Sequence, residues 1–315
     1  MKIAIASTVK SEPQALLDFL DYHLDRGIDF IYLFFDDPED RAIPIVSSYE
    51  RVSSFLCDDR HWSLMVEQYG HVFPHCDLTV HTVRQRFNAT HALELSRKDG
   101  IDWMMHIDVD EYVFPIRRLR RILNRTVFRS LRYTILEAVN IDAADHIRRT
   151  DVEYFKAPAG LSFPTSLKYP VNSLKLAICS VLFGGGQPIF KKFIQGHTKS
   201  KVIFRTTNTI RYCGIHEPKY YGPIPTRRLF RIYLLHYYSM GYAPWKEKLM
   251  LKIPALGKKK YGPSISKMIR LAGDYRDGKI SDDELRDVYL RNIVLDPDLQ
   301  KRLVKFGLVR RLTTD

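Results

Sequence analysis

The chain has 315 residues, and its 45% hydrophobic content excludes a disordered protein. The 49 lysines and arginines outnumber the 36 aspartates and glutamates, and the net charge of +13 favours an anionic partner: nucleic acid, a phosphate-bearing substrate or an anionic membrane surface. No stretch reaches the roughly 18 apolar residues of a membrane span, the N-terminal segment is too short and charged for a signal peptide, and the four cysteines are widely spaced. We therefore expect a cytoplasmic protein that can rest on the inner face of a membrane.

Strand and helix patterns alternate along the first third of the chain. Residues 2–8 and 29–37 predict strands, and the residues between them, 12–27, carry the apolar stripe and end signals of a helix. A second helix is predicted over 85–100, and a long apolar strand over 101–114. This alternation predicts an α/β fold with a mainly parallel sheet and helices on both faces.

Acidic residues follow the predicted strands. Asp36 and Asp37 end one strand, and Asp108 and Asp110 lie near the end of another. In parallel sheets, ligands bind at the carboxyl ends of the strands. The sequence therefore predicts a binding site at this edge of the sheet.

The stretch WMMHIDVDEYVF (103–114) places three carboxylates in an otherwise apolar run. A buried ionised carboxylate is costly unless it is paired or holds a metal, so we expect a cation at this strand end. In an extended strand, Asp108 and Asp110 point to the same side, which suits Mg²⁺ or Mn²⁺ bound together with a substrate phosphate. The structural alternative is a strand end with solvated acids.

The remaining two thirds of the chain change character twice. Residues 140–230 look irregular and include the glycine-rich segment 183–188, and from 231 onward four helical patterns follow, with Ser281 as a helix start. Three basic residues in the irregular region are candidate diphosphate contacts: Lys199, Lys201 and Arg205. The basic runs 117–121 and 257–262 predict solvated faces, with phosphate or anionic lipid contact as the alternative.

Four segments together resemble the family 2-type glycosyltransferases, especially the subgroup close to family 92. They are VKSEPQALLDFLDYHLDRG, which matches the opening of that group except for Ser11 in place of asparagine, then RQRFNATHAL, HIDVDEYVF and LLHYYSMGYAPWKEKL. The resemblance implies the GT-A fold, with a catalytic domain over 1–230 that binds a nucleotide-sugar and a helical C-terminal extension over 231–315.

The resemblance also implies an activity: metal-dependent transfer of a sugar from a nucleotide-sugar, most simply a UDP-sugar, to a glycan or lipid-linked glycan, with inversion. Contacts to the donor would come from Val9, Lys10, Glu12, Asp36, Asp37, Gln85, Asn88 and Asp108. The ligands of the Mn²⁺ or Mg²⁺ ion would be Asp108, Asp110 and His236. Candidates for the base that deprotonates the acceptor are Glu137, Asp142, His216 and Glu217.

Two other functions fit part of the sequence. A non-catalytic protein that binds nucleic acid would use the positive charge, but the basic residues are dispersed and no nucleic-acid motif is present, so we expect no nucleic-acid partner. A sugar-1-phosphate nucleotidyltransferase would share the metal chemistry, but the N-terminal segment ASTVKSEP lacks a glycine-rich phosphate loop.

Overall fold

In the computed structural model, the chain forms two compact units. The described residues are 1–10, 12–73, 76–141, 144–159, 169–183, 200–238, 240–256 and 263–313. The first unit comprises 1–134 and 199–234, and the second comprises 135–198 and 235–315. The crossing after Leu234 lies close to the domain boundary expected at 230/231. Residues 135–198 differ from that expectation, because they group with the C-terminal helices rather than with the N-terminal domain.

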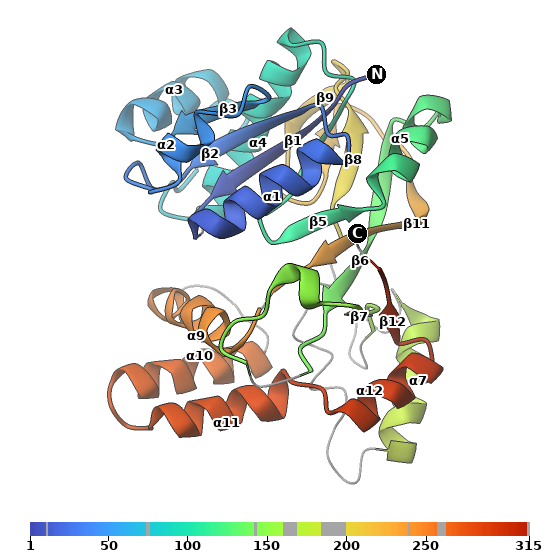
Figure 1. Ribbon diagram of the computed structural model, residues 1–315. Helices are drawn as coiled ribbons and strands as arrows, with labels where there is room; N and C mark the ends of the chain where they lie inside the picture. The colour runs from blue at the N-terminus through green and yellow to red at the C-terminus, as the bar shows by residue number, and fades with distance from the viewer. Residues whose placement is uncertain are drawn as a thin grey trace. The chain divides into compact units, whose positions relative to one another are not determined.

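The first unit is built on a mixed sheet (Figure 1). Its parallel part consists of β1 (Ile3–Val9), β2 (Phe30–Phe35), β3 (Val52–Leu56) and β4 (Trp103–His106). Two antiparallel strands extend it beyond β4: β8 (Val202–Arg205) and then β6 (Ser130–Ala138). The strand order in this unit is β6-β8-β4-β1-β2-β3. The central strand β1 is buried along its whole length, as its apolar sequence predicts.

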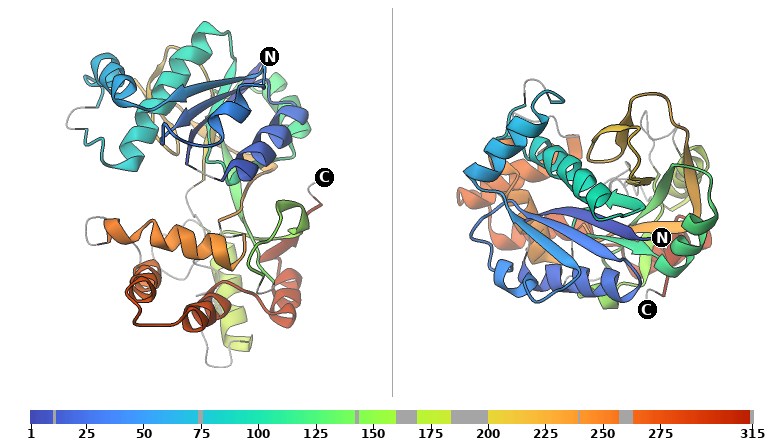
Figure 2. Two further views of the ribbon diagram at one scale, coloured as in Figure 1. Left: turned by 60° about the vertical axis from the view of Figure 1, so that its left-hand side comes forward. Right: turned by 90° about the horizontal axis from the view of Figure 1, so that it is seen from above.

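Helices cover both faces of this sheet, which confirms the predicted α/β class. The longest two, α1 (Pro13–Asp25) and α4 (His81–Lys98), lie on opposite faces (Figure 2, right). Ala89 and Ala92 of α4 pack against Ala4 of β1 and Phe34 of β2, and these small side chains allow helix and sheet to approach closely. The other helices of the unit are α2 (Ile43–Val46), α3 (Asp59–Tyr69) and α5 (Ile116–Arg125).

The single strand predicted over 101–114 is wrong. The chain forms β4, turns at residues 107–110, and continues as β5 (Glu111–Phe114), which pairs with β11 (Thr226–His236). The turn is closed by the Glu111 amide, which donates to the Asp108 carbonyl (2.9 Å). Asp108 and Asp110 therefore do not alternate along an extended strand, and the argument that placed them on one side of it does not apply. A separate hairpin is formed by β9 (Ile210–Cys213) and β10 (Pro218–Tyr220).

The second unit confirms the helical pattern after residue 231. It contains α7 (Pro170–Phe183), α9 (Tyr242–Met250), α10 (Pro263–Arg276), α11 (Asp282–Asn292) and α12 (Pro297–Lys305), the 3₁₀ turns η1 (Arg149–Asp151) and η2 (Ile253–Ala255), and the antiparallel pair β7 (Tyr154–Lys156) and β12 (Val309–Arg311). The predicted helix start at Ser281 is a capping box with Glu284. Leu176 of α7 packs with Leu303 of α12, which explains why residues 135–198 belong to this unit. In the described ranges, we find no helix whose length and apolar character would let it span a bilayer.

Candidate functional site

The carboxyl ends of β1, β2 and β4 meet at one edge of the first unit's sheet. The parallel register pairs Val9 with Phe35 and Ala6 with His106. The residues that follow these strands, Asp36 and Asp108 among them, therefore emerge at the same edge, which is where a parallel sheet binds its ligands.

A buried lysine supplies the cation at the acidic strand end. The Nζ atom of Lys201 lies 3.0 Å from Asp108 Oδ2 and 3.5 Å from Glu111 Oε2. Gln85 Nε2 donates to the other oxygen of Asp108 (2.9 Å), and the Asp108 amide donates to Glu111 Oε2 (2.9 Å). The side chains of Lys201 and Glu111 are 2% and 0% exposed, whereas that of Asp108 is 32% exposed. Asp108 is thus held by Lys201 and Gln85 while part of its side chain remains in contact with solvent.

Lys201 carries its charge in spite of its burial. Burial alone would lower the pKa of its ammonium, but the charges and hydrogen bonds of Asp108 and Glu111 hold that pKa above its ordinary value. The neighbouring His106 behaves in the opposite way: burial, assisted by the charge of Lys201, lowers its pKa to about 4. At neutral pH, the centre of this edge therefore holds a lysine cation beside a neutral imidazole.

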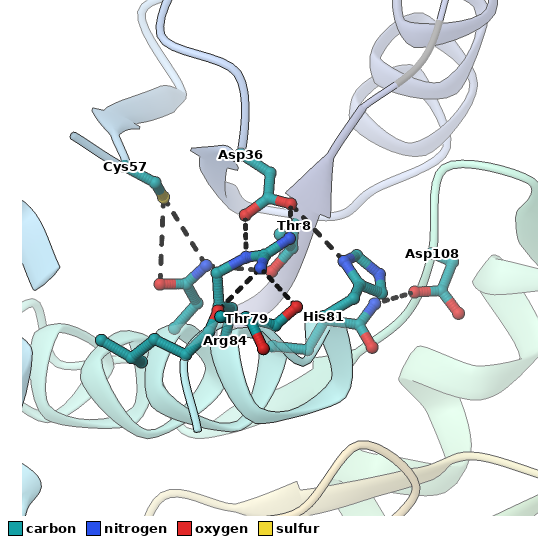
Figure 3. Close-up of polar contacts among 10 residues, drawn as sticks. Thr8, Asp36, Cys57, Thr79, His81, Arg84 and Asp108 are labelled. Atoms are coloured by element: carbon teal, nitrogen blue, oxygen red, sulfur yellow. Dashed lines mark hydrogen bonds and ion pairs between the residues drawn. The ribbon is translucent and has the colours of Figure 1, made fainter. Parts of the chain in front are cut away.

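The second acidic strand end forms a closed ion pair (Figure 3). Both oxygens of Asp36 accept hydrogen bonds from Arg84, each at 2.6 Å, and His81 Nδ1 lies 3.5 Å from Oδ2. Burial would raise the pKa of Asp36, but the bonds from His81 and Arg84 hold it well below its usual range. The same guanidinium donates to the Leu78 carbonyl (2.8 Å), so this pair fixes the start of α4, which also carries Gln85.

The other predicted donor contacts divide between the interior and the surface. Asn88 is fully buried and bonds Thr8 Oγ1 (3.1 Å) and His61 Nε2 (3.0 Å), so it ties α4 to β1 and α3. Val9 is also fully buried, whereas Lys10 and Glu12 are exposed after β1 and Asp37 is half-buried after β2. Of this group, the structure leaves Lys10, Glu12 and Asp37 accessible at the site edge.

The loop with the candidate bases His216 and Glu217 belongs to the same unit. His106 Nδ1 lies 3.4 Å from the Ile215 carbonyl, which connects this loop to the end of β4. The carboxylate of Glu217 forms ion pairs with Arg132 and with Lys219 (3.2 Å). Burial would raise its pKa, but Arg132 and Lys219 lower it below the ordinary value. Glu217 is therefore ionised at neutral pH.

Two further candidates form a buried cluster within the second unit. His236 Nδ1 lies 3.0 Å from Glu137 Oε2. Lys156 is buried as well, and burial lowers the pKa of its ammonium while the charge of Glu137 raises it in part. The structure thus brings Glu137 and His236 together. Asp142 and Lys199 lie outside the described residues.

The acidic edge offers few protein ligands for a metal ion. In the part of the chain that the structure describes, no group of three or more His, Cys, Asp or Glu side chains is arranged to hold a metal. Asp108 already accepts from Lys201 and Gln85, and Asp110 is half-buried in the turn after β4. Mg²⁺ commonly takes one or two carboxylates and completes its sphere with substrate phosphates and water. An ion here would have at most the carboxylates of Asp108 and Asp110 as protein ligands, so it would need phosphate and water oxygens to complete its sphere.

Comparison with known proteins gives structural likenesses alone. Neither a protein-family model nor a curated protein sequence matches the chain. One similar solved structure is residues 1–349 of S. aureus TarS, with 10% sequence identity over 90% of this chain and 73% of that chain and a TM-score of 0.39. Another is a mannose-1-phosphate geranyltransferase from Thermus thermophilus, with 10% identity over 54% of this chain and 53% of that chain and a TM-score of 0.26. A third is a putative glucose-1-phosphate thymidylyltransferase from Bacillus anthracis, with 12% identity over 94% of this chain and 85% of that chain and a TM-score of 0.26. Function is therefore argued from the geometry of the site.

Sequence reasoning named Gln85 and Lys201 without pairing them with Asp108, and it missed Arg84, the partner of Asp36. Arg84 lies next to Gln85, which the resemblance did single out, and one helical turn of basic and polar residues there was a signal that α4 begins at the site. Lys201 was named as a diphosphate contact, whereas the structure shows it bound to Asp108 and Glu111. The expected cation at the strand end is a residue of the chain itself.

Proposed function

We propose that this protein is a glycosyltransferase of GT-A type that transfers a sugar from a nucleotide-sugar, most simply a UDP-sugar, to a glycan or lipid-linked glycan acceptor, with inversion. The observation that carries the proposal is the acidic edge of the parallel sheet. There, Asp108 is held by a buried Lys201 and by Gln85 while about a third of its side chain stays exposed. A carboxylate oriented in this way is suited to a polar ligand, because its rotamer is fixed before the ligand arrives.

The contacts of Asp108 and Asp36 support the roles that we assign to them, and the role of Asp110 comes from the resemblance. Asp108 faces the ribose or the metal, and Lys201 and Gln85 position it. Asp110 would hold a Mn²⁺ or Mg²⁺ ion together with the diphosphate of the donor. When bound, such an ion supplies Lewis-acid stabilisation of the diphosphate leaving group. Asp36 acts through Arg84 by ordering the start of α4, and Asp37 is the more accessible partner for the nucleoside.

The proton of the acceptor hydroxyl needs a base. Glu217 is ionised and partly exposed, at 39%, on a loop connected to the end of β4. Glu137, paired with His236, and His216, the residue before Glu217, are the other candidates among the described residues. A base acts through its pKa and its reach, so kinetics on Gln variants of both residues separates them.

The donor part of the proposal is tested by calorimetry with UDP, in the presence of Mn²⁺ and in the presence of EDTA. We expect the wild type to bind UDP with Mn²⁺, and we expect both EDTA and Asp110→Asn to weaken binding at least tenfold. Glu67→Gln is the matched control, because it removes one negative charge from an exposed position on α3. UDP binding that is indifferent to Mn²⁺ and to Asp110 would remove the metal from the proposal. If the protein binds none of UDP, GDP, CMP and TDP, the proposal that it is a glycosyltransferase is refuted.

A further inference from the structure

Helix α5 carries an excess of positive charge that the fold does not use. Its ten residues include five arginines and no acid. Arg120 is used internally, because it donates to the Gly27 carbonyl and pairs with Asp29. For Arg117, Arg118, Arg121 and Arg125, we find no carboxylate partner among the residues that the structure describes. An anion from outside the unit is the natural complement of this helix.

Three of these arginines lie along one flank of the helix. Positions 118, 121 and 125 are spaced i, i+3 and i+7, and their side chains line a cavity of about 550 Å³ with Ile122 and Thr126. The buried residues of the helix, Ile116, Leu119 and Leu123, face the core instead. The positive flank is therefore the outer flank, and the cavity opens on it.

An exposed apolar side chain follows directly. Val127 comes one residue after the cavity and is 87% exposed. The guanidinium of Arg227 lies over the ring of the next residue, Phe128, 5.1 Å from the centroid of that ring. Ser130 Oγ lies 2.8 Å from Thr226 Oγ1. These contacts place the start of β11, with Arg227, beside residues 128–130, the segment that follows α5 and Val127.

Strand β11 places the aromatic side chain of Phe230 in solvent beside a residue with an unfavourable backbone conformation. Arg231 has a φ of 56°, in the left-handed region that is unfavourable for a non-glycine residue. As a result, Phe230 and Arg231 both point outward between the buried Leu229 and Ile232. Phe230 is 72% exposed, and the Arg231 guanidinium lies 5.2 Å from its ring centroid.

We propose that the arginine surface, which comprises Arg118, Arg121, Arg125, Val127 and Arg227, binds an anionic phospholipid membrane. Arginines next to a membrane gain from the negative surface potential, and an apolar side chain beside them gains by entering the headgroup layer. Nucleic acid would use the arginines but would gain little from an aliphatic Val127, since nucleic-acid binders stack bases on aromatic rings. The proposal is independent of the transferase activity, because it uses none of the residues at the acidic edge.

The test is sedimentation of the full chain with vesicles of phosphatidylcholine, with and without phosphatidylglycerol. We expect binding to the mixed vesicles only, and weaker binding at high salt. Arg118→Gln/Arg121→Gln/Arg125→Gln should lower the partition constant on the order of a hundredfold, because each arginine near an anionic surface contributes roughly fivefold. The uncharged change Val127→Ser should lower it roughly fivefold.

The control removes the same charge elsewhere. Arg60→Gln/Lys98→Gln/Lys305→Gln replaces three exposed basic residues on other helices and should leave vesicle binding within twofold of wild type. Equal losses in both triple variants would overturn the proposal, because bulk charge would then explain binding. Absence of wild-type binding to the mixed vesicles would also overturn it, as would tighter binding of a single-stranded oligonucleotide that competes with them. Circular dichroism should show an unchanged fold, since the replaced side chains lie at the surface.

Discussion

The two aspartates that follow β2 and β4 have equivalent places in the sheet and different environments. Asp36 is 4% exposed, and both of its oxygens are bound by Arg84. Asp108 is 32% exposed, and its partners Lys201 and Gln85 hold it from the buried side. The first arrangement is closed and fixes the fold of the edge, whereas the second leaves about a third of the Asp108 side chain in solvent. That exposure is what the proposed binding role of Asp108 requires and what Asp36 lacks.

The largest effect on this comparison is expected from Lys201→Met. The substitution leaves the carboxylates of Asp108 and Glu111 without the buried cation, and losing one member of a buried ion pair costs about 3–5 kcal/mol. Urea unfolding at pH 7 measures the loss. The double variant Lys201→Met/Glu111→Gln should recover part of it, because one buried negative charge is then absent. A cost of about 1 kcal/mol with no recovery would show that the ammonium does not balance these carboxylates.

The second-largest loss of stability is expected from Asp36→Asn, which should lower the free energy of unfolding by about 2–3 kcal/mol. The same substitution should change UDP affinity less than threefold. The pKa of Asp36 is lower in the folded state, so its contribution is present above its unfolded pKa of about 4 and is lost as the pH falls below that value. The stability difference between wild type and Asp36→Asn should therefore shrink between pH 6 and pH 3.

Two outcomes would contradict the closed role of Asp36. A difference in stability that is independent of pH would mean that the ion pair with Arg84 does not hold the pKa down. A tenfold loss of UDP affinity at unchanged stability would assign Asp36 to the nucleoside directly. Asp37→Asn serves as the comparison, because that neighbouring side chain is half-buried and its substitution should weaken UDP binding while leaving unfolding unchanged.

Asp108→Asn is expected to show the reverse balance. Lys201 keeps Glu111 as a partner, so the loss of stability should stay at about 1 kcal/mol, since Asp108 is partly screened by solvent. UDP affinity in the presence of Mn²⁺ should fall at least tenfold, because the open carboxylate is replaced by an amide. Calorimetry and urea unfolding on one preparation give both values. Unchanged UDP affinity together with a large loss of stability would show that Asp108, like Asp36, serves the fold and not the binding of UDP.

The sequence predicted the elements of the fold through local patterns. Ser281, three residues before Glu284, predicts the start of α11, and the apolar strands before Asp36 and Asp108 predict the edge at which the site lies. Helix α7 was missed inside the irregular region, although Pro170 at its first turn and glycines after Phe183 are helix-end signals. The turn at 107–110 was missed because Val109 continues the apolar run.

Partners of charged residues are harder to predict, because they come from distant parts of the chain. Lys201 is 93 residues from Asp108, and Arg84 is 48 residues from Asp36. No periodicity or spacing records such a pair, since it is made by the register of β8 beside β4 and by the packing of α4 on the sheet. The sequence predicts a buried carboxylate at this strand end, which the structure shows for Glu111 and not for Asp108, and with it the need for a cation, but not which cation the fold supplies.

The smallest effect on stability is expected from Glu217→Gln. Its ion pairs with Arg132 and Lys219 lie at the surface, where such pairs contribute about 0.2–1 kcal/mol, so urea unfolding should barely change. If Glu217 takes the proton of the acceptor, kcat for sugar transfer should fall roughly 10²–10⁴-fold while UDP affinity stays constant. Lys219→Gln keeps the carboxylate and should retain kcat within a few-fold. A normal kcat in Glu217→Gln together with a loss in Glu137→Gln would assign the proton to the Glu137–His236 pair instead, and the ion pairs of Glu217 would then serve only to order its loop.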